Sequence, residues 1–324
     1  MTVIGGAGFV GTNLCQLLSD KQIAFEIVDL KVSGRFPEKS KIGDVRDIAS
    51  LRSAVSGDLV VNLAAVHRDD VIDKRDYQRT NVLGAENIAK ICREKGIKKI
   101  VFTSSVAVYG FAEPETDESG AINPFNEYGR TKFAAEEIFR HWQSETGHSL
   151  QIIRPTVIFG EGNRGNVYNL FQQIASGNFV MIGSGQNKKS MAFVGNVVEF
   201  IQACMNETSS YGVYNYVDTP NLTMAQLVSE VRQNLGRGNG TGLRLPYFVG
   251  LLIGYLGDAF TIVTGKKIPV SSIRVKKFCS SSEFNCSTAP KGHVAKHRLE
   301  DAISRTINAE FLHPDPNREI FFTE

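Results

Sequence analysis

The sequence predicts an α/β protein, in which a doubly wound parallel sheet is followed by a smaller C-terminal domain. Short apolar runs typical of strands alternate with amphipathic stretches typical of helices through the first half of the 324 residues. A glycine-rich turn joins the first such strand to the first such helix, and after about residue 160 the alternation stops. This length accommodates about two domains of ordinary size.

The elements of the first half follow in a regular order. We expect strands at Thr2–Ile4, Ala24–Leu30, Asp58–Leu63, Lys98–Thr103 and Leu150–Ile153, with a further short strand that ends at Gly43. We expect helices at Phe9–Leu18, Thr80–Lys95 and Asn126–Glu145. Helices between consecutive strands act as crossovers, which make neighbouring strands parallel.

The second half is less regular, because Gly, Asn and Lys concentrate between residues 161 and 189. Its patterns predict helices at Val167–Ala175 and Val194–Met205, a strand at Gly212–Val217 and a loop at Gly236–Gly242. We therefore expect a first domain over residues 1–165, joined by a returning segment at about 192–217. Residues 166–324 would then form mainly a substrate-binding domain.

The composition excludes several classes of protein. Lys and Arg number 36 against 34 Asp and Glu, so the chain lacks the basic excess that nucleic-acid binding needs. The five cysteines are scattered without a CxxC spacing, which argues against a disulfide framework and against a metal site. We expect a reducing, cytoplasmic compartment, because the first apolar residues run into glycines instead of forming a signal peptide.

The glycine-rich turn predicts a dinucleotide site. Gly5, Gly8 and Gly11, with Phe9 and Val10 between them, connect the first strand to the first helix. Glycines allow a tight turn and a close approach of backbone N–H groups to a pyrophosphate, which then lies at the positive end of the helix. A purely structural glycine turn is the alternative reading of this motif.

Two acidic residues at predicted strand ends strengthen this reading. Asp29 ends the second strand, where a carboxylate accepts hydrogen bonds from the adenine ribose and repels a 2′-phosphate, so NAD is favoured over NADP. Lys31 and Arg35 lie nearby and would soften that preference unless they are solvated surface charges. Asp44, followed by Val45, either binds the adenine or closes a turn.

A tyrosine and a lysine four residues apart suggest catalytic chemistry. Tyr128 and Lys132 share one face of a predicted helix, and Ser104 and Ser105 follow the end of the preceding strand. A free tyrosine has a pKa near 10, and a neighbouring ammonium lowers that pKa towards neutrality. The pair therefore predicts a general base.

Together these motifs resemble the extended short-chain dehydrogenase/reductase family, the NAD-dependent epimerases and dehydratases. The resemblance covers nearly the whole chain and includes the segments 62–65 and 102–110. It implies a Rossmann domain, bound NAD and a homodimer formed through the helices that start near Thr80 and Asn126. By family pattern, Ser105, Tyr128 and Lys132 are catalytic, and Asn81 steadies the helix and the lysine. Ala64, Ala65, Ser104 and His67 would lie at the cofactor, although His67 is equally well explained as a structural residue.

Longer stretches resemble one branch of this family. Residues 62–70, 154–169 and 272–279 are similar to bacterial epimerases that convert undecaprenyl-diphosphate-linked N-acetylglucosamine to its N-acetylgalactosamine epimer for O-antigen assembly. The resemblance implies that C4 is oxidised transiently by NAD and that hydride returns to the other face of the sugar. Three alternatives remain open: a UDP-N-acetylglucosamine 4-epimerase, a 4-keto-6-deoxy-sugar reductase and a non-catalytic NAD-binding scaffold.

One departure from the family pattern bears on the substrate. Lys189 stands where many UDP-sugar enzymes carry a diphosphate-binding arginine, and a lysine cannot form the bidentate fork. Arg164, Arg274, Lys276 and Lys277 are further candidates for binding a diphosphate, and a solvated surface position explains each of them equally well.

The segment Leu245–Leu256 is almost entirely apolar, yet it is too short to span a bilayer. Arg244 precedes it, and Lys266 and Lys267 follow it. Such an arrangement suits a helix that lies in the membrane interface with its cations at the headgroups. A helix packed on the substrate domain or in an oligomer contact is the alternative.

Overall fold

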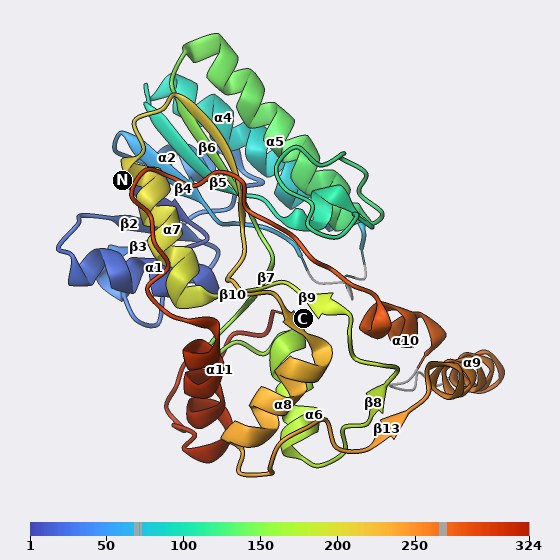
Figure 1. Cartoon of the computed structure of the whole chain (residues 1–324). Helices are drawn as coiled ribbons and strands as arrows, with labels where there is room; N and C mark the ends of the chain where they lie inside the picture. The colour runs from blue at the N-terminus through green and yellow to red at the C-terminus, as the bar shows by residue number, and fades with distance from the viewer. Residues whose placement is uncertain (68–70, 72, 266–270, 324) are drawn as a thin grey trace.

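A computed structural model describes residues 1–67, 71, 73–265 and 271–323. Its centre is a seven-stranded sheet in the order β11-β6-β5-β4-β1-β2-β3, and every neighbouring pair is parallel (Figure 1). The strands are β1 (Thr2–Ile4), β2 (Glu26–Asp29), β3 (Ser40–Ile42), β4 (Leu59–Asn62), β5 (Lys99–Thr103), β6 (Ser149–Pro155) and β11 (Tyr211–Tyr216). The predicted doubly wound α/β fold is confirmed.

Helices cover both faces of this sheet. On one face lie α1 (Phe9–Asp20) and α7 (Val194–Asn206), and on the other lie α2 (Ile48–Ala54), α4 (Gly84–Glu94) and α5 (Glu127–Thr146). Successive strand residues point to opposite faces, so each central strand supplies both layers. In β6, for example, Ile153 packs in the core on the α1 and α7 side, and Ile152 packs beneath α4 and α5.

The second half forms a smaller helical unit below the carboxyl ends of the strands (Figure 1). Its helices are α6 (Asn166–Ala175), α8 (Met224–Asn234), α9 (Tyr247–Thr264), α10 (Ser272–Cys279) and α11 (Leu299–Ile307). Short strand pairs connect them: β7 (Val157–Phe159) with β10 (Met191–Phe193), β8 (Met181–Ile182) with β13 (Arg244–Leu245), and β9 (Lys188–Lys189) with β12 (Leu222–Thr223). Between α6 and α8 in the chain, α7 and β11 return to the first domain: β11 pairs with β6, and α7 packs in the same core as α1. The domain boundary near residue 165 stays a prediction.

The helix expected at Thr80–Lys95 is less uniform than its pattern suggests. A short helix α3 (Arg75–Tyr77) leads into a π-helical turn, η2 (Gln78–Leu83), before α4 begins. Wide turns of this kind concentrate at functional sites, and this one carries Asn81, whose side chain is buried. Three short 3-10 or π segments complete the structure: η1 (Pro37–Lys39), η3 (Val106–Tyr109) and η4 (Asn308–Leu312).

Two sequence predictions lie partly outside the described residues. They concern the last three residues of the 62–70 motif, and Lys266 and Lys267 beyond the apolar segment. In the part of the chain that the structure describes, every helix is too short or too polar to cross a membrane.

Candidate active site

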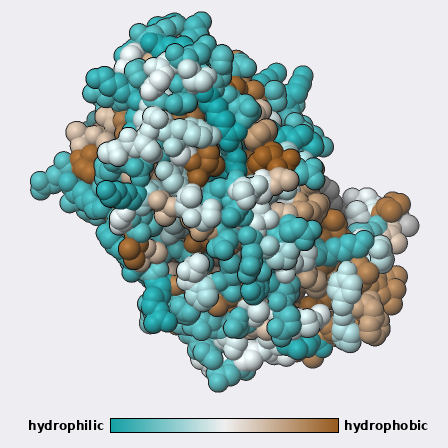
Figure 2. Space-filling model, turned by 45° about the horizontal axis from the view of Figure 1, so that its top comes forward, coloured by the Kyte–Doolittle hydropathy of each residue, from teal (hydrophilic) through white to brown (hydrophobic). Residues whose placement is uncertain are grey.

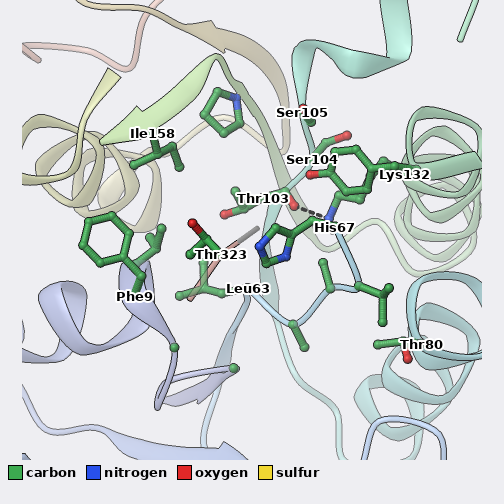
Figure 3. A pocket seen from close by; sticks show the side chains of 18 of the residues that line it. Phe9, Leu63, His67, Thr80, Thr103, Ser104, Ser105, Lys132, Ile158 and Thr323 are labelled. Carbon is green, nitrogen blue, oxygen red and sulfur yellow. Dashed lines mark hydrogen bonds between the residues drawn. The ribbon is translucent and has the colours of Figure 1, made fainter. Parts of the chain in front are cut away.

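A cavity of about 740 Å³ opens at the carboxyl ends of the central strands. The glycine turn lines one side of it, and Ser104, Ser105 and Lys132 line the other, as Figure 3 shows for the side chains it labels. Residues that follow β6 in the chain, including Ile158, Asn163 and Phe284, close the remaining wall. Ligands of open parallel sheets bind at this edge, so the cavity lies where the topology predicts a site.

The glycine turn has the geometry that a pyrophosphate needs. Gly5 has a φ of +80°, and a Cβ at this position would lie 2.7 Å from the backbone nitrogen of Ala64. A Cβ on Gly11 would lie 2.4 Å from the carbonyl oxygen of Gly5. Gly8 is the N-cap of α1 and offers no capping side chain, so the first N–H groups of the helix face the cavity.

We expect Gly11→Val to abolish retention of NAD. Its side chain would collide with backbone atoms of the turn, which cannot move as the end of a flexible side chain can. The measurement is the NAD released on denaturation per mole of purified protein. Gly34→Ala is the control for loss of a glycine, because an added Cβ there would meet only the carboxylate end of the Glu319 side chain. Full NAD content in Gly11→Val would contradict the placement of the pyrophosphate on this turn.

The carboxylate of Asp29 lies at the end of β2, beside the turn. It accepts hydrogen bonds from the backbone N–H of Ala7 at 2.9 Å and of Leu30 at 2.7 Å. These bonds orient the carboxylate and leave lone pairs for ribose hydroxyl donors. Asp29 therefore fits the role predicted for it, which remains a prediction.

Asp44 has a partner that the sequence analysis did not consider. Arg46 forms a forked ion pair with this carboxylate, at 2.8 Å for the closest contact, and both residues line the cavity. The hydrogen bond from Arg46 lowers the pKa of Asp44. An anionic acceptor fixed by an arginine suits an adenine amino group. Val45, which is buried, lines the same region of the cavity.

The predicted catalytic residues come together at the end of β5. Lys132 is 2% exposed, and its Nζ donates a hydrogen bond of 2.6 Å to the carbonyl oxygen of Thr103. The same ammonium lies 4.3 Å from the centroid of the Phe102 ring. Ser105 and Tyr128 line the cavity beside it, and Ser105 is also the N-cap of η3. The four-residue spacing on α5 therefore places Tyr128 and Lys132 in one site.

In the chain alone, burial is the largest influence on the pKa values of Tyr128 and Lys132. It raises the pKa of Tyr128 to about 12, and a hydrogen bond with Ser105 opposes the shift. Burial likewise lowers the pKa of Lys132 to about 7, against the attraction of Glu136. Desolvation is the largest cause at both groups, and it favours the neutral form of each. That Lys132 lowers the pKa of Tyr128 stays a prediction.

Asn81 holds the site together from the π-helical turn. Its Oδ1 accepts from the Val66 N–H at 2.8 Å, and its Nδ2 donates to the Val66 carbonyl and to the Thr131 hydroxyl, both at 3.0 Å. Asn81 thus ties the segment after β4 to α5, next to Lys132. This geometry describes a positioning residue. Ala64, Ala65 and His67 lie in the same segment and line the cavity.

A buried ion pair behind the site was missed by the sequence analysis. Arg154 on β6 donates to both carboxylate oxygens of Glu136 at 2.9 and 2.6 Å, and to the hydroxyl of Tyr109 at 2.7 Å. Glu136 follows Lys132 by one turn of α5 and is completely buried. The pair fixes α5 against the sheet, and removal of Glu136 would leave the buried charge of Arg154 without its carboxylate partner. Sequence alone could not show that a residue of this helix contacts a residue of this strand.

The C-terminal segment also reaches the cavity, which the sequence analysis did not predict. Thr323 lines it and donates to the side chain of Asn163 at 2.6 Å. Backbone hydrogen bonds between Phe321 and the segment 162–164 hold this end of the chain in place.

Three of the five candidates for binding a diphosphate are placed differently from the catalytic group. Arg164 pairs with Glu310 at 2.6 Å, and Lys189 donates to the carbonyls of Lys277 and Ser280 at 3.0 and 2.6 Å. Burial lowers the pKa of Lys189 to about 8. Arg274 is exposed on α10. None of the three is among the described residues that line the cavity, so their proposed contact with a diphosphate stays a prediction.

Comparison with known proteins agrees with this geometry. Residues 1–216 match the NAD dependent epimerase/dehydratase family. An Escherichia coli O157:H7 protein, N-acetyl-alpha-D-glucosaminyl-diphospho-ditrans,octacis-undecaprenol 4-epimerase, is 48% identical over 328 residues, which cover 99% of this chain and 98% of that protein. The UDP-glucose 4-epimerase of Vibrio cholerae is 28% identical over 70% of this chain and 73% of its own length.

Solved structures share the fold over nearly all of the chain. The UDP-glucose 4-epimerase of Thermotoga maritima has a TM-score of 0.75 at 19% identity, covering 96% of this chain and 97% of that one. The UDP-glucuronic acid 4-epimerase of Bacillus cereus, solved with NAD, has a TM-score of 0.71 at 16% identity, covering 95% and 97%. The chain belongs to the NAD-dependent epimerase/dehydratase family, and its cofactor is NAD.

Proposed function

We propose that the chain is a 4-epimerase that interconverts N-acetylglucosamine and N-acetylgalactosamine carried on undecaprenyl diphosphate. The observation that carries the proposal is the 48% identity over 99% of the chain to the Escherichia coli enzyme of that name. The cavity supports it, since it brings a serine, a tyrosine and a lysine to the predicted cofactor.

The residues of the chain divide the chemistry between them. When bound, NAD supplies an acceptor that takes a hydride and gives it back. Tyr128 accepts the proton of the sugar C4 hydroxyl as the phenolate and returns it after inversion. Ser105, which is hydrogen-bonded to Tyr128, holds the same sugar oxygen. Lys132, anchored on the Thr103 carbonyl, positions the cofactor ribose and favours the phenolate.

Inversion requires the oxidised sugar to present its other face. The sugar must turn over inside the site, while a more distant part of the substrate stays bound. The cavity of about 740 Å³ is lined both by the predicted NAD-binding residues and by Ser105 and Tyr128, so cofactor and sugar would share one space. Firm binding is therefore expected outside the sugar, at the diphosphate.

The function is tested by incubating the purified protein with polyprenyl-diphosphate-linked and UDP-linked N-acetylglucosamine side by side, followed by sugar analysis. We expect N-acetylgalactosamine from the lipid-linked substrate and little from the UDP-sugar. Efficient turnover of the UDP-sugar alone would favour a nucleotide-sugar epimerase. Stoichiometric loss of absorbance at 340 nm with added NADH would instead identify a reductase.

We also propose that α9 binds the membrane interface as a peripheral element. In this helix the glycines face the rest of the protein and the large apolar side chains face the solvent, which is the opposite of a helix packed in a core. A Cβ on Gly254 would lie 2.8 Å from Ser272, whereas Phe248, Leu252 and Leu256 are 71%, 60% and 63% exposed. Figure 2 shows hydrophobic residues gathered on the right-hand edge of the molecule, where Figure 1 places α9.

Replacement of Phe248, Leu252 and Leu256 by serine should release the protein from anionic phospholipid vesicles. Each side chain contributes at most about 1.5–3 kcal/mol when it is buried in an apolar environment. Sedimentation with vesicles measures binding, and the NAD content should stay that of the wild type. Ile42→Ser, Val294→Ser and Leu312→Ser together form the control, since these exposed apolar residues lie on other elements. A wild-type protein that never sediments with vesicles would refute the proposal.

For assembly we propose a homodimer in which α4 and α5 of two copies form a four-helix contact. The two helices pack side by side on one face of the sheet (Figure 1), and Leu83 at the start of α4 is 40% exposed. Light scattering coupled to size-exclusion chromatography would establish the oligomeric state.

A further inference from the structure

Two exposed aromatic rings lie at the rim of the cavity and take no part in the proposed chemistry. Phe111 and Phe125 stack with ring centroids 4.5 Å apart and an interplanar angle of 29°. They are 72% and 43% exposed, so water covers a large share of an apolar surface. Neither residue is predicted to bind the cofactor.

The backbone fixes this pair beside the reacting groups. Gly110, which precedes Phe111, lines the cavity, and so does Asn126, which follows Phe125. Gly110 has a φ of +69°, and a Cβ there would lie 1.9 Å from the Asn123 carbonyl, so the two segments are in direct contact. Asn126 caps α5, the helix that carries Tyr128. Each ring therefore belongs to a residue directly next to one that lines the cavity.

Cations of α10 connect this rim to α9. The Lys277 ammonium lies 5.6 Å from the centroid of the Phe125 ring, and the Lys276 ammonium lies 5.5 Å from the centroid of the Tyr255 ring on α9. Lys189 holds the last turn of α10 through the Lys277 and Ser280 carbonyls. Beyond that turn, Ser282 and Phe284 line the cavity. A continuous path thus runs from the cavity, over an aromatic pair and a lysine, to the exposed apolar helix.

We infer that Phe111, Phe125 and Lys277 form a subsite for the prenyl diphosphate part of the substrate, with the first isoprene units on the two rings and the diphosphate at the lysine. The inference rests on the proposed function and adds a specificity determinant to it. An anion followed directly by an apolar chain matches a cation beside an exposed aromatic surface. A uridine diphosphate offers the same anion followed by a polar ribose, which gains little from these rings. Among the described residues Lys277 forms no salt bridge, so its charge is available to a ligand.

The test is binding of geranyl diphosphate and of inorganic pyrophosphate to the NAD-loaded protein, measured by titration calorimetry. We expect the wild type to bind geranyl diphosphate about tenfold more tightly than pyrophosphate, which corresponds to burial of about two methylene groups. Phe111→Ser with Phe125→Ser should remove this preference and leave pyrophosphate binding unchanged. Phe111→Leu with Phe125→Leu should keep most of it, because the surface stays apolar. Lys277→Gln should weaken both ligands by a similar factor.

Three results would overturn the inference. The first is equal binding of the two ligands by the wild type. This result would refute the subsite even if the double serine variant failed to retain NAD, because it needs no variant. The second is an undiminished preference in the double serine variant, and the third is unchanged pyrophosphate binding in Lys277→Gln. Because binding needs no turnover, a protein that passes this test and yet epimerises no sugar would refute the proposed function and not the subsite.

Discussion

Tyr128→Phe is expected to lower kcat about 10²–10⁴-fold, the usual contribution of a positioned general base. The substitution removes one oxygen and leaves the ring, so the folded site and its NAD content should be those of the wild type. Tyr168→Phe is the matched control, because this ring stacks on Phe311 with centroids 5.4 Å apart and does not line the cavity. Near-normal turnover in Tyr128→Phe would refute the mechanism.

The same residue predicts the direction of the pH dependence. Burial raises the pKa of Tyr128 to about 12 in the protein alone, so the phenolate is a minor form at neutral pH. Below the pKa of a base, its deprotonated fraction rises about tenfold with each pH unit. We therefore expect kcat/KM to rise from neutral to mildly alkaline pH. A flat profile in that range would indicate that Tyr128 is not the proton acceptor in a rate-limiting step.

Lys132→Met is expected to reduce turnover by at least about 100-fold and to lower the NAD content as well. The variant fills the space of the lysine stem but loses the ammonium that donates to the Thr103 carbonyl. That carbonyl would then lack its partner, at a cost of about 1–3 kcal/mol if it stays buried. The loss of both functions distinguishes this variant from Tyr128→Phe, in which NAD should remain.

Lys99→Met provides the control, because Lys99 is a half-buried lysine. Its ammonium also donates to backbone carbonyls, including that of Met205 at 2.9 Å, and burial lowers its pKa. Lys99 does not line the cavity. This variant should lose stability while it keeps NAD and activity. Equal loss of NAD in the two variants would mean that Lys132 acts only through the fold.

The order of strands and helices in the first domain could be read from the sequence because its signals are local. A buried parallel strand is a short apolar run, and residues such as Ile152 and Ile153 fill the two opposite core layers. The glycine turn and the Tyr128–Lys132 spacing are also local patterns. The residues that these patterns indicate line one cavity in the structure.

Contacts between distant segments could not be predicted in this way. Glu136 looks like a surface charge on a helix until β6 places Arg154 against it. Arg164 looks like a free cation until the C-terminal part of the chain supplies Glu310. For the segment 245–256 the sequence left two readings open, and only the structure shows that its glycines face the protein. The π-helical turn at 78–83 was missed because a single additional residue leaves helical periodicity almost unchanged.

The central claim is inversion at C4 by removal and return of one hydride within the site. It is tested most directly with polyprenyl-diphosphate-linked N-acetylglucosamine that carries deuterium at C4, incubated with the protein in ordinary water. A hydride held between sugar and cofactor does not exchange with solvent. The account therefore predicts N-acetylgalactosamine with the deuterium retained at C4 and no net change in NADH. Product that has lost the label to water, or a lipid-linked sugar that is never epimerised, would contradict it.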